Sequence, residues 1–363
     1  MLEQREQALR LTTSDEELLL PFAWLRDNCQ CEQCFVPSLG EKTFALASLN
    51  EAPTVANAAE QGDTLLIHWS DGHQSQFTLP WLIQRQRRDS TAWQGWRSGF
   101  SLPECDFESF AREDACAEEA IARFSLSGAL LLKNAPCETG AMELLQHRLG
   151  PIREVVFGRL HSVVLDPGGY NIALTSLALP PHSDLASMSH PPSLQGLHMI
   201  SNQCSGGESI IVDGWAVAES LRAEHPDWFD LLCTTSVPFR IFDRRHETRS
   251  FGPVISLNTA NEIRGFRYSN QTMQALPLNT PCLDEFYKAY TELSRRILSA
   301  KWQHLFRLNT GEMLLVHNHR VLHGRTAFRA DGERHLEDAY FDWENCMAHR
   351  IVLRREIQQA LEQ

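Results

Sequence analysis

The sequence of 363 residues has no apolar run long enough to span a bilayer, and its first residues, Met-Leu-Glu-Gln-Arg-Glu, lack the basic and then apolar segments of a signal peptide. Low-complexity segments and fixed-period repeats are also absent. Basic residues are scarce relative to acidic ones, 33 against 46, and the net charge of -13 would repel a phosphate backbone. We therefore expect a cytoplasmic protein that binds neither membranes nor nucleic acid.

The composition is otherwise that of a globular protein, with 43% hydrophobic and 22% charged residues. The length allows a main domain with a sizeable core and a smaller second domain. Of the ten cysteines, three lie within residues 29–34 and seven are scattered along the chain. Without a secretion signal, this distribution favours free thiols and a metal site over disulfides.

Residues 1–97 predict a small β-rich domain. Strand-like stretches at 64–69 and 74–79 flank a Ser-Asp-Gly turn, which is the pattern of a β-hairpin. Residues 98–114 are rich in Ser, Gly, Pro and acidic residues and predict a linker. The remaining residues, 115–363, form the predicted large domain.

The large domain is predicted to be mainly β with flanking helices, an α+β arrangement built on an antiparallel sandwich or jelly roll. Many spaced strands with few βαβ alternations argue against a doubly wound parallel sheet. Short apolar runs predict strands, and apolar residues at three- and four-residue intervals predict helices. The predicted strands are residues 129–133, 209–213 and 312–317, and the predicted helices are residues 115–124, 140–149, 283–300 and about 343–362.

The stretch at 179–185 reads Leu-Pro-Pro-His-Ser-Asp-Leu, which places His182 and Asp184 at positions i and i+2. On a strand these two side chains share a face and can reach the same metal ion. Two histidines and one carboxylate form the facial triad of non-haem Fe(II) oxygenases, which leaves three coordination positions open. In such enzymes 2-oxoglutarate fills two of these positions and O2 takes the third.

A second histidine must come from a distant part of the chain, and His323 lies in the stretch Arg-Val-Leu-His-Gly-Arg at 320–325. Arg334 follows eleven residues later, and its guanidinium matches the far carboxylate of 2-oxoglutarate. His317 and His319 compete for the role of iron ligand, but neither has an arginine at the matching offset within an Arg-His-Leu motif. The sequence therefore favours His323.

With these motifs, the chain resembles the taurine dioxygenase-like family of Fe(II)- and 2-oxoglutarate-dependent oxygenases over nearly its whole length, most closely the γ-butyrobetaine dioxygenase branch. Further matching stretches are Gly-Gly-Glu-Ser at 206–209, Glu-Arg-His-Leu-Glu at 333–337 and Tyr-Phe-Asp-Trp at 340–343. The resemblance implies a double-stranded β-helix (jelly-roll) catalytic domain, contact of Ser209 with 2-oxoglutarate, and a homodimer. It also implies hydroxylation of a small polar metabolite with release of succinate and CO2.

Three cysteines in the pattern C-x-C-x2-C, Cys29, Cys31 and Cys34, are spaced too tightly for independent packing. Thiolates select zinc, and three sulfur ligands need a fourth ligand to complete a tetrahedron. The resemblance implies His73, in the turn Trp-Ser-Asp-Gly-His, as that ligand, with His68 as the alternative. Such a closed site leaves no position for a substrate, so its role would be structural. The competing interpretation is three reduced cysteines without a metal.

The resemblance also suggests which residues contact the substrate. Enzymes of the γ-butyrobetaine branch enclose a trimethylammonium group in aromatic rings. The matching positions here hold Phe157, His161, Leu174 and Leu185, so most of the rings are missing, although Tyr340 matches a cage tyrosine. We therefore expect a substrate other than γ-butyrobetaine, such as a different amine, amino acid or organic anion.

Polar residues are candidates to replace the missing rings. Asn171 matches a family asparagine that binds the substrate carboxylate, Asn270 is a further polar candidate, and His161 stands where the family has a tryptophan. Residues 239–249 contain four arginines. They predict either a basic loop that receives an anionic substrate group or a solvated loop with internal acidic partners.

Two other functions fit parts of the sequence. One is a non-catalytic protein on the same fold that binds a metabolite or a partner, against which the intact iron and 2-oxoglutarate motifs argue. The other is an oxygenase that hydroxylates a protein side chain. The homodimer interface that the resemblance implies would lie on residues 283–300 or on the C-terminal helix at about 343–362.

Overall fold

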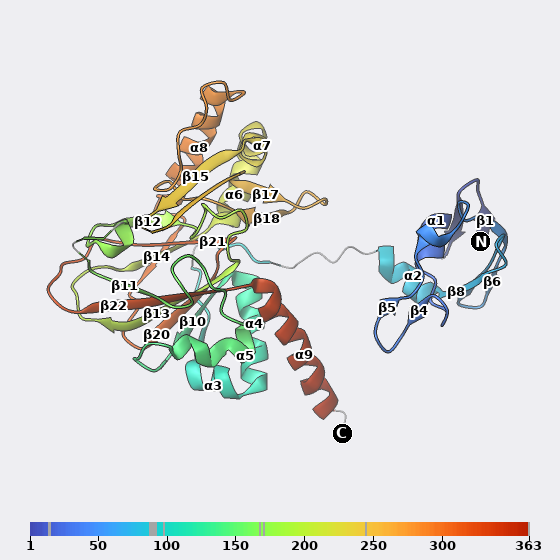
Figure 1. The fold of residues 1–363 in the computed structure, drawn as a ribbon, viewed down its shortest axis with the longest axis horizontal. Coiled ribbons are helices and arrows are strands. Elements are labelled where there is room, and N and C mark those ends of the chain that lie inside the picture. The colour runs from blue at the N-terminus through green and yellow to red at the C-terminus, as the bar shows by residue number, and fades with distance from the viewer. Residues whose placement is uncertain are drawn as a thin grey trace. The chain divides into compact units, whose positions relative to one another are not determined.

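The computed structural model describes residues 1–13, 16–86, 93–96, 99–166, 168–169, 171–243 and 245–361. The chain divides into two compact units, Met1–Thr91 and Ala92–Gln363 (Figure 1). Among the described helices, none combines the length and the apolar character that a membrane span requires.

The N-terminal unit contains two three-stranded antiparallel sheets, β1-β2-β3 and β6-β7-β8. Buried and exposed residues alternate along β2, β3, β7 and β8, so each sheet has one face in a small apolar core. The paired strands β7 and β8 confirm the predicted hairpin. The elements of this unit are β1 (Leu2–Gln4), β2 (Ala8–Thr12), β3 (Glu17–Pro21), α1 (Phe22–Asp27), β4 (Phe35–Val36), β5 (Glu41–Lys42), η1 (Leu46–Ser48), β6 (Val55–Gln61), β7 (Thr64–Trp69), β8 (Gln74–Thr78) and α2 (Leu79–Gln86).

The C-terminal unit is a sandwich of two sheets, and all their strand pairs are antiparallel except β9 with β10. The larger sheet has the strand order β11 (His161–Val164), β22 (Arg334–Phe341), β13 (Leu194–Asn202), β20 (Glu312–His317), β10 (Ala129–Lys133) and β9 (Glu104–Asp106). The smaller sheet has the order β12 (Leu179–His182), β21 (Val321–Arg325), β14 (Ser209–Asp213) and β19 (Gln303–Phe306). This arrangement confirms the mainly β, jelly-roll prediction.

Strand β20 shows how the sequence builds the layers. Its alternate residues Leu314 and Val316 face the second sheet and belong to the core between the sheets, together with Ile211 of β14. Met313 and Leu315 point the other way, into a core shared with helices. A strand buried on both faces needs a continuous apolar run, which is why this stretch reads Met-Leu-Leu-Val.

Helices cover the outer faces of both sheets (Figure 1). The larger sheet is covered by α3 (Phe107–Arg112), α4 (Asp114–Ser127), η2 (Ala141–Leu145), α5 (Gln146–Leu149) and α9 (Trp343–Leu361). The smaller sheet is covered by α6 (Gly214–Glu224), α7 (Pro226–Thr234), α8 (Leu283–Ile297) and the hairpins β15 (Val237–Phe242) with β16 (Glu247–Gly252) and β17 (Ile255–Leu257) with β18 (Ile263–Phe266). A further short turn of helix, η3 (Ile172–Leu174), lies between β11 and β12.

Two segments differ from the prediction. Residues 104–112, within the predicted linker, form β9 and α3, because Phe107 and Phe110 are buried in the helical core and anchor the segment to the larger sheet. The arginine-rich stretch is a β-hairpin, β15 with β16, rather than a loop. Composition predicted a linker at the first place and a loop at the second, whereas tertiary packing and strand pairing give both segments regular structure.

The core between the sheets yields a stability prediction. Leu314→Ala should lower the free energy of unfolding by roughly 2–5 kcal/mol, because the side chain is 1% exposed and its removal leaves a cavity. Leu305→Ala on β19 is the matched control, since that side chain is 51% exposed. Urea unfolding followed by circular dichroism measures both, and equal midpoints for the two variants would contradict the assignment of Leu314 to the core.

Candidate functional site

Two strands of the smaller sheet bring the predicted triad together. β12 and β21 pair so that His182 stands opposite His323, and Asp184 lies two residues beyond the end of β12. The Nε2 atom of His182 is 3.1 Å from Oδ1 of Asp184, and the Nε2 atom of His323 is 3.9 Å from Oδ2. All three ligand atoms lie within 4.8 Å of one another, so a single metal ion can bind all three.

Both imidazoles are prepared for coordination. Nδ1 of His182 lies 3.0 Å from the carbonyl oxygen of Pro180. When Nδ1–H donates to that carbonyl, the lone pair of Nε2 is free for a metal. Burial and the neighbouring His182 together lower the pKa of His323 to about 4, although Asp184 acts in the opposite direction. His323 is therefore uncharged at neutral pH and can act as a ligand.

Asp184 is fixed through both its backbone and its side chain. The side-chain amide of Asn318 accepts a hydrogen bond from the Asp184 N–H at 2.8 Å and donates one to the Asp184 carbonyl oxygen at 3.1 Å. Oδ2 accepts hydrogen bonds from Gln195 at 2.6 Å and from the Tyr340 hydroxyl at 2.8 Å. Such partners orient a metal-binding carboxylate.

The surroundings also keep Asp184 ionised and force an unusual backbone after it. Burial alone would raise the pKa of Asp184, but His323 and His182 beside it hold the pKa well below its usual value. The next residue, Leu185, has a φ of 56°, in the left-handed region that residues other than glycine rarely adopt. Backbone strain of this kind is concentrated at functional sites.

Two cavities meet at the triad. The large chamber has a volume of about 280 Å³ and the small pocket about 80 Å³. His182, Asp184 and Asp338 line both of them, so the position between the three metal-binding side chains is accessible from two sides. An arrangement of this kind can bring two different molecules to one metal ion.

The small pocket is lined by Ser209, His323, Arg325 and Arg334, among other residues. Burial lowers the pKa of Arg334, and its buried Nε atom has no hydrogen-bond acceptor among the described residues. Within the part of the chain that the structure describes, Arg334 has no acidic partner. A desolvated guanidinium of this kind favours an anionic ligand, and a carboxylate matches its geometry.

Arg325 has a different role in the small pocket. Its guanidinium donates to the backbone carbonyl oxygens of Leu177 and Thr175, both at 2.5 Å, and lies 3.3–3.4 Å from those of Ala173 and Ile172. It therefore fixes the segment 172–177, part of which forms a wall of the large chamber. These contacts engage Nη1 and Nη2 and hold the Arg325 side chain against this segment.

Five of the positions that the sequence associates with the substrate line the large chamber. Phe157 and His161 stack on each other, with ring centroids 5.1 Å apart. Asn171, Leu185 and Tyr340 complete the set. The chamber thus has few aromatic side chains at the predicted cage positions, as the sequence indicates.

Two predicted positions do not line the chamber. Leu174 is buried in its surroundings, and its neighbours Ile172 and Ala173 face the chamber instead, because the short helical turn η3 rotates successive side chains. Asn270 is exposed and lies 3.4 Å from the Tyr290 hydroxyl, whereas the next residue, Gln271, lines the chamber. In both places the backbone is irregular, and the residue that lines the chamber lies one or two positions away from the predicted one.

Three further site residues were missed at the sequence level: Gln195, Asn318 and Asp338. Asp338 was the one that strand periodicity could have identified. It stands two residues before Tyr340 and four after Arg334 on β22, and alternate residues of a strand share a face. Gln195 and Asn318 are close to Asp184 only in the folded chain, and no local pattern marks them.

The two competing histidines have structural surroundings. His317 is buried, and its ring centroid lies 4.4 Å from that of Trp343 and 5.7 Å from that of Trp215. Nε2 of His319 lies 2.9 Å from the carbonyl oxygen of Pro191. Neither belongs to the metal-binding group of His182, Asp184 and His323.

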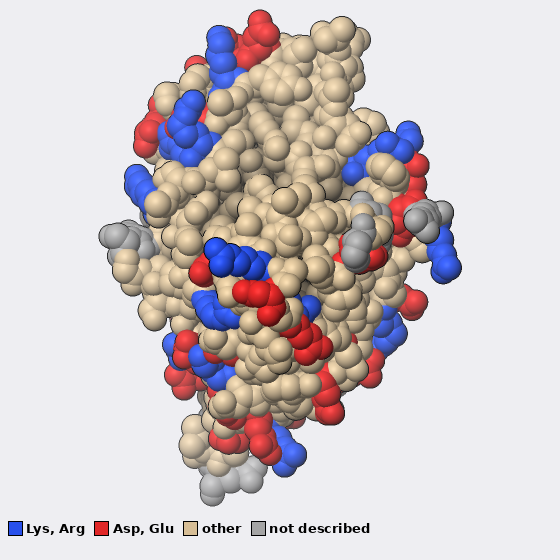
Figure 2. Space-filling model, turned by 90° about the vertical axis from the view of Figure 1, so that its left-hand side faces the viewer, with Lys and Arg blue, Asp and Glu red and all other residues tan. Residues whose placement is uncertain are grey.

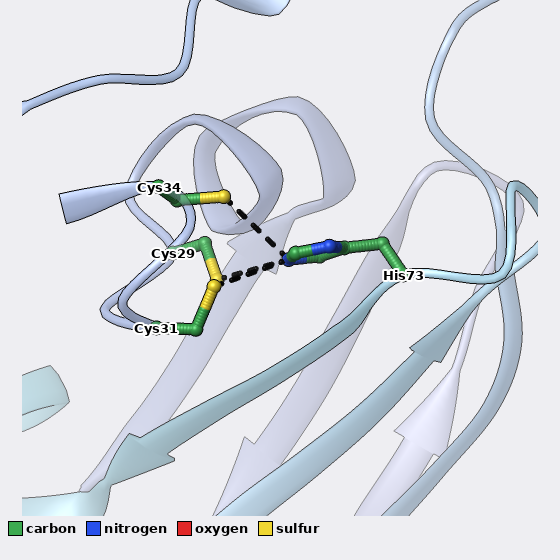
Figure 3. Close-up of side chains that lie close together, drawn as sticks. All are labelled: Cys29, Cys31, Cys34 and His73. Atoms are coloured by element: carbon green, nitrogen blue, oxygen red, sulfur yellow. Dashed lines mark hydrogen bonds between the residues drawn. The ribbon is translucent and has the colours of Figure 1, made fainter.

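The cysteine cluster forms a second metal-binding group in the N-terminal unit. The sulfur atoms of Cys29, Cys31 and Cys34 converge on Nε2 of His73, at 3.3, 3.6 and 3.6 Å (Figure 3). Three thiols and one imidazole within 4.8 Å of one another are a donor set that fits tetrahedral zinc. The alternative ligand His68 is exposed and is not part of the group.

Arg26 and Asp71 hold this cluster in place. The guanidinium of Arg26 lies 3.5 Å from the sulfur of Cys34 and 3.6 Å from Oδ2 of Asp71. Oδ1 of Asp71 accepts a hydrogen bond from the His73 N–H at 2.9 Å and so fixes the turn that carries the imidazole. A nearby cation stabilises thiolates, which are the form that binds metal.

The arginine-rich stretch at 239–249 has acidic partners on the surface of the protein. Basic and acidic side chains are interspersed on the face that Figure 2 shows. In the hairpin β15–β16, Arg240 and Arg249 both pair with Glu247, the former at 2.8 Å. The internal acidic partners that the sequence allowed are therefore present, although Arg240 also lines the large chamber. Arg244 lies outside the described residues.

Comparison with known families matches both units. The family described as "Taurine catabolism dioxygenase TauD, TfdA family" matches residues 87–340, and "Gamma-butyrobetaine hydroxylase-like, N-terminal" matches residues 1–83. The chain belongs to the TauD, TfdA dioxygenase family. This membership confirms the predicted enzyme class.

Individual relatives of this family member match along most of their length. Gamma-butyrobetaine dioxygenase of Pseudomonas sp. (strain AK-1) is 33% identical, over 92% of this chain and 90% of the relative. The human enzyme of the same name is 29% identical, over 95% of this chain and 93% of its own. Mitochondrial trimethyllysine dioxygenase of Gallus gallus is 27% identical, over 92% and 82%.

Solved structures agree on the fold. A putative alpha-ketoglutarate-dependent taurine dioxygenase from Burkholderia xenovorans is similar with a TM-score of 0.52 and 13% identity, over 69% of this chain and 92% of that one. The non-heme iron oxygenase OrfP, in complex with Fe and alpha-ketoglutaric acid, gives a TM-score of 0.51 and 14% identity, over 67% and 94%. At these identities the comparison supports the jelly-roll fold alone.

The cysteine cluster yields a metal-content prediction. The purified protein should retain one zinc ion in the N-terminal unit, and Cys34→Ser should lose it. Burial raises the pKa of the Cys34 thiol to about 11 against the pull of Arg26, so zinc must displace a proton and its affinity should rise with pH. Elemental analysis after dialysis at two pH values tests both statements.

The matched control is Cys137→Ser, which removes an exposed thiol outside the cluster. Equal zinc content in the Cys34 and Cys137 variants would contradict the proposed ligand set. It would instead favour reduced cysteines without a metal.

Proposed function

We propose that the protein is an Fe(II)- and 2-oxoglutarate-dependent dioxygenase that hydroxylates a small polar metabolite. One observation carries this proposal. Two histidines and a carboxylate converge where two cavities meet, and the smaller cavity contains the guanidinium of Arg334, which has no acidic partner within the described residues. A protein that only binds a metabolite needs neither an open metal site nor a second pocket with a carboxylate-binding arginine.

His182, Asp184 and His323 would hold the iron, and their chemistry fits it. Imidazole and carboxylate ligands on one side of the ion are the donor set of non-haem Fe(II) oxygenases. Bound there, Fe(II) would couple the oxidative decarboxylation of 2-oxoglutarate by O2 to C–H hydroxylation, with succinate and CO2 as co-products. The chain supplies the ligand geometry, the orientation of both organic molecules and the exclusion of other reactions.

The small pocket is the proposed 2-oxoglutarate site. Arg334 would pair with the far carboxylate, and Ser209, at the start of β14, would add a hydroxyl contact. Both residues line the pocket together with His323, so a molecule bound there would have one end at the guanidinium and the other near the metal ligands. 2-Oxoglutarate, which has a carboxylate at each end, is a ligand of this kind.

The large chamber is the proposed substrate site. Gamma-butyrobetaine and trimethyllysine, in the names of the relatives, are both quaternary ammonium compounds. Only some of the predicted cage positions in this chain carry aromatic rings: Phe157 and Tyr340 line the chamber, but His161 and Leu185 occupy the other lining positions. We infer a betaine-, amine- or amino-acid-like substrate other than γ-butyrobetaine.

The N-terminal unit is proposed to be a structural zinc-binding domain. Its apolar core is small, and a closed site of three cysteines and His73 would tie α1, the following turn and the β7–β8 hairpin together. The metal would stabilise this unit without taking part in the oxidation.

We also propose that the protein works as a homodimer in the cytoplasm. No disulfide joins any of the ten cysteines, all of which lie within the described residues, and a reducing compartment maintains such a state. Ile351 and Val352 on α9 are 62% and 45% exposed, and Leu298 just after α8 is 55% exposed. Apolar side chains exposed on α9 and at the end of α8 support the interface that the sequence suggests.

The iron site gives the most direct mutational prediction. His182→Ala should lower succinate formation by more than about 100-fold, because it removes a metal ligand and not only a contact around it. Iron content and zinc content should separate, with iron lost and zinc retained. His147→Ala, an exposed histidine on α5, is the control. Full succinate formation in the His182 variant would rule out this triad.

The 2-oxoglutarate site gives a second prediction. Arg334→Ala should raise the KM for 2-oxoglutarate by about 30-fold or more, since a partly buried charge pair costs roughly 2–5 kcal/mol when one partner is removed. Arg329→Ala, an exposed arginine five residues earlier, is the control. If the two variants share the wild-type KM, the carboxylate is bound elsewhere.

A further inference from the structure

We propose that Asp338 anchors the substrate through a cationic nitrogen that carries N–H groups, a protonated primary or secondary amine and not a quaternary ammonium. This inference rests on the proposed function and specifies the substrate class of the large chamber. It also makes Asp338 a specificity-determining residue for the reaction.

Asp338 lies at the wall of the chamber and is hardly exposed to solvent. It stands on β22 and is 5% exposed, yet it lines both the large chamber and the small pocket. Its strand neighbours at i-4 and i+2 are Arg334 and Tyr340, so all three side chains are on the face of the strand that points to the two cavities. A ligand in the large chamber therefore meets a carboxylate beside the metal ligands.

The Asp338 carboxylate shares its nearby hydrogen-bond donors with Asp184. The Tyr340 hydroxyl lies 2.8 Å from Oδ2 of Asp184 and 3.2 Å from Oδ2 of Asp338, but it has only one proton to donate. Gln195 is likewise closer to Asp184, at 2.6 Å, than to Asp338, at 3.5 Å. The shorter contacts go to Asp184, so Oδ2 of Asp338 keeps only long ones.

The other oxygen of Asp338, Oδ1, has even fewer hydrogen-bond partners. Oδ1 is buried and accepts no hydrogen bond from the described residues. The nearest cation candidate is His161, whose Nδ1 lies 3.4 Å from Oδ1. That distance is long for a charge-assisted hydrogen bond, which is typically about 2.7–2.9 Å. A buried carboxylate with so little support destabilises the empty chamber, and a ligand that supplies donors removes that penalty.

The chemistry of the missing partner follows from what the carboxylate lacks. A protonated amine brings positive charge and N–H donors, so it can form the charge-assisted hydrogen bonds that Asp338 does not have. A trimethylammonium group brings the charge but no donor, and it is stabilised by aromatic faces instead. The hydroxyl of the remaining cage tyrosine, Tyr340, is directed at two carboxylates, and Phe157 stacks on His161.

Other polar atoms at the chamber wall have no hydrogen-bond partner among the described residues. These are Oδ1 of Asn171 and both side-chain amide atoms of Gln271, which are buried, and both residues line the chamber. Arg240 lines it as well and offers a guanidinium. A small ligand with several polar groups fits these surroundings, which is why amino acids are better probes than simple alkylamines.

The test is a binding measurement under anaerobic conditions with Fe(II) and 2-oxoglutarate present. Isothermal titration calorimetry compares linear ω-amino acids of three to six carbons with their N-trimethyl counterparts. At least one amino acid should bind ten-fold or more tightly than its trimethylated counterpart. In Asp338→Asn, which keeps the shape but removes the charge, this ratio should fall to about one.

Glu337→Gln is the matched control. Glu337 is the preceding residue of β22, is also buried, and accepts a hydrogen bond from the Gly140 N–H at 3.0 Å on the other face of the strand. This variant should keep the wild-type ratio. If the affinity ratio fell equally in both variants, the cause would be a general effect of charge loss in the strand. That result would overturn the proposed role of Asp338.

The wild-type ratio is decisive even if the Asp338 variant does not fold. Equal or tighter binding of the trimethylated compounds overturns the proposal, as does the absence of binding by any amino acid in the series. The absorption band of the Fe(II)–2-oxoglutarate complex, recorded in the same samples, distinguishes failure of the amine anchor from failure of the proposed function. If the band forms, only the amine anchor is wrong; if it does not form, the proposed function fails together with it.

Discussion

The register between β12 and β21 is the constraint on which the rest of the site depends. It sets His182 opposite His323, and the two residues that follow bring Asp184 to the same place. A slip by one residue would turn every side chain of one strand to the other face. The core between the sheets opposes such a slip, because Val321 of β21 and Ile211 of β14 are buried in it. Apolar packing therefore fixes the geometry of a polar, metal-binding site.

The polar groups behind the triad are divided unequally between two carboxylates. Asp184 takes the short hydrogen bonds of Gln195 and Tyr340 and has a pKa held below its usual value by His323 and His182, in spite of burial. Asp338 is left with long contacts, and burial raises its pKa although His161 lowers it. One carboxylate is thus completed by the protein alone as a metal ligand. The other is the natural partner for a molecule that comes from outside.

Much of the site could be predicted from sequence, because residue type and spacing encode chemistry directly. In the structure His182, Asp184 and His323 lie together, as do the three cysteines and His73, and Arg334 lines the adjacent small pocket. The apolar run at 312–317 forms the predicted strand, β20. The errors have a common cause. Residues 104–112 look like a linker by composition but are anchored by Phe107 and Phe110, and Leu174 and Asn270 fall in irregular backbone where no period relates sequence to direction. Gln195 and Asn318 meet Asp184 only through long-range pairing, so no single stretch contains their signal.

The most direct test of the account is a crystal structure of the protein loaded anaerobically with Fe(II) and 2-oxoglutarate, with anomalous scattering recorded at the iron and zinc edges. We predict iron between His182, Asp184 and His323, zinc at the cysteine cluster, and 2-oxoglutarate in the small pocket with its far carboxylate on Arg334. Iron at any other position, or 2-oxoglutarate bound away from Arg334, would contradict it.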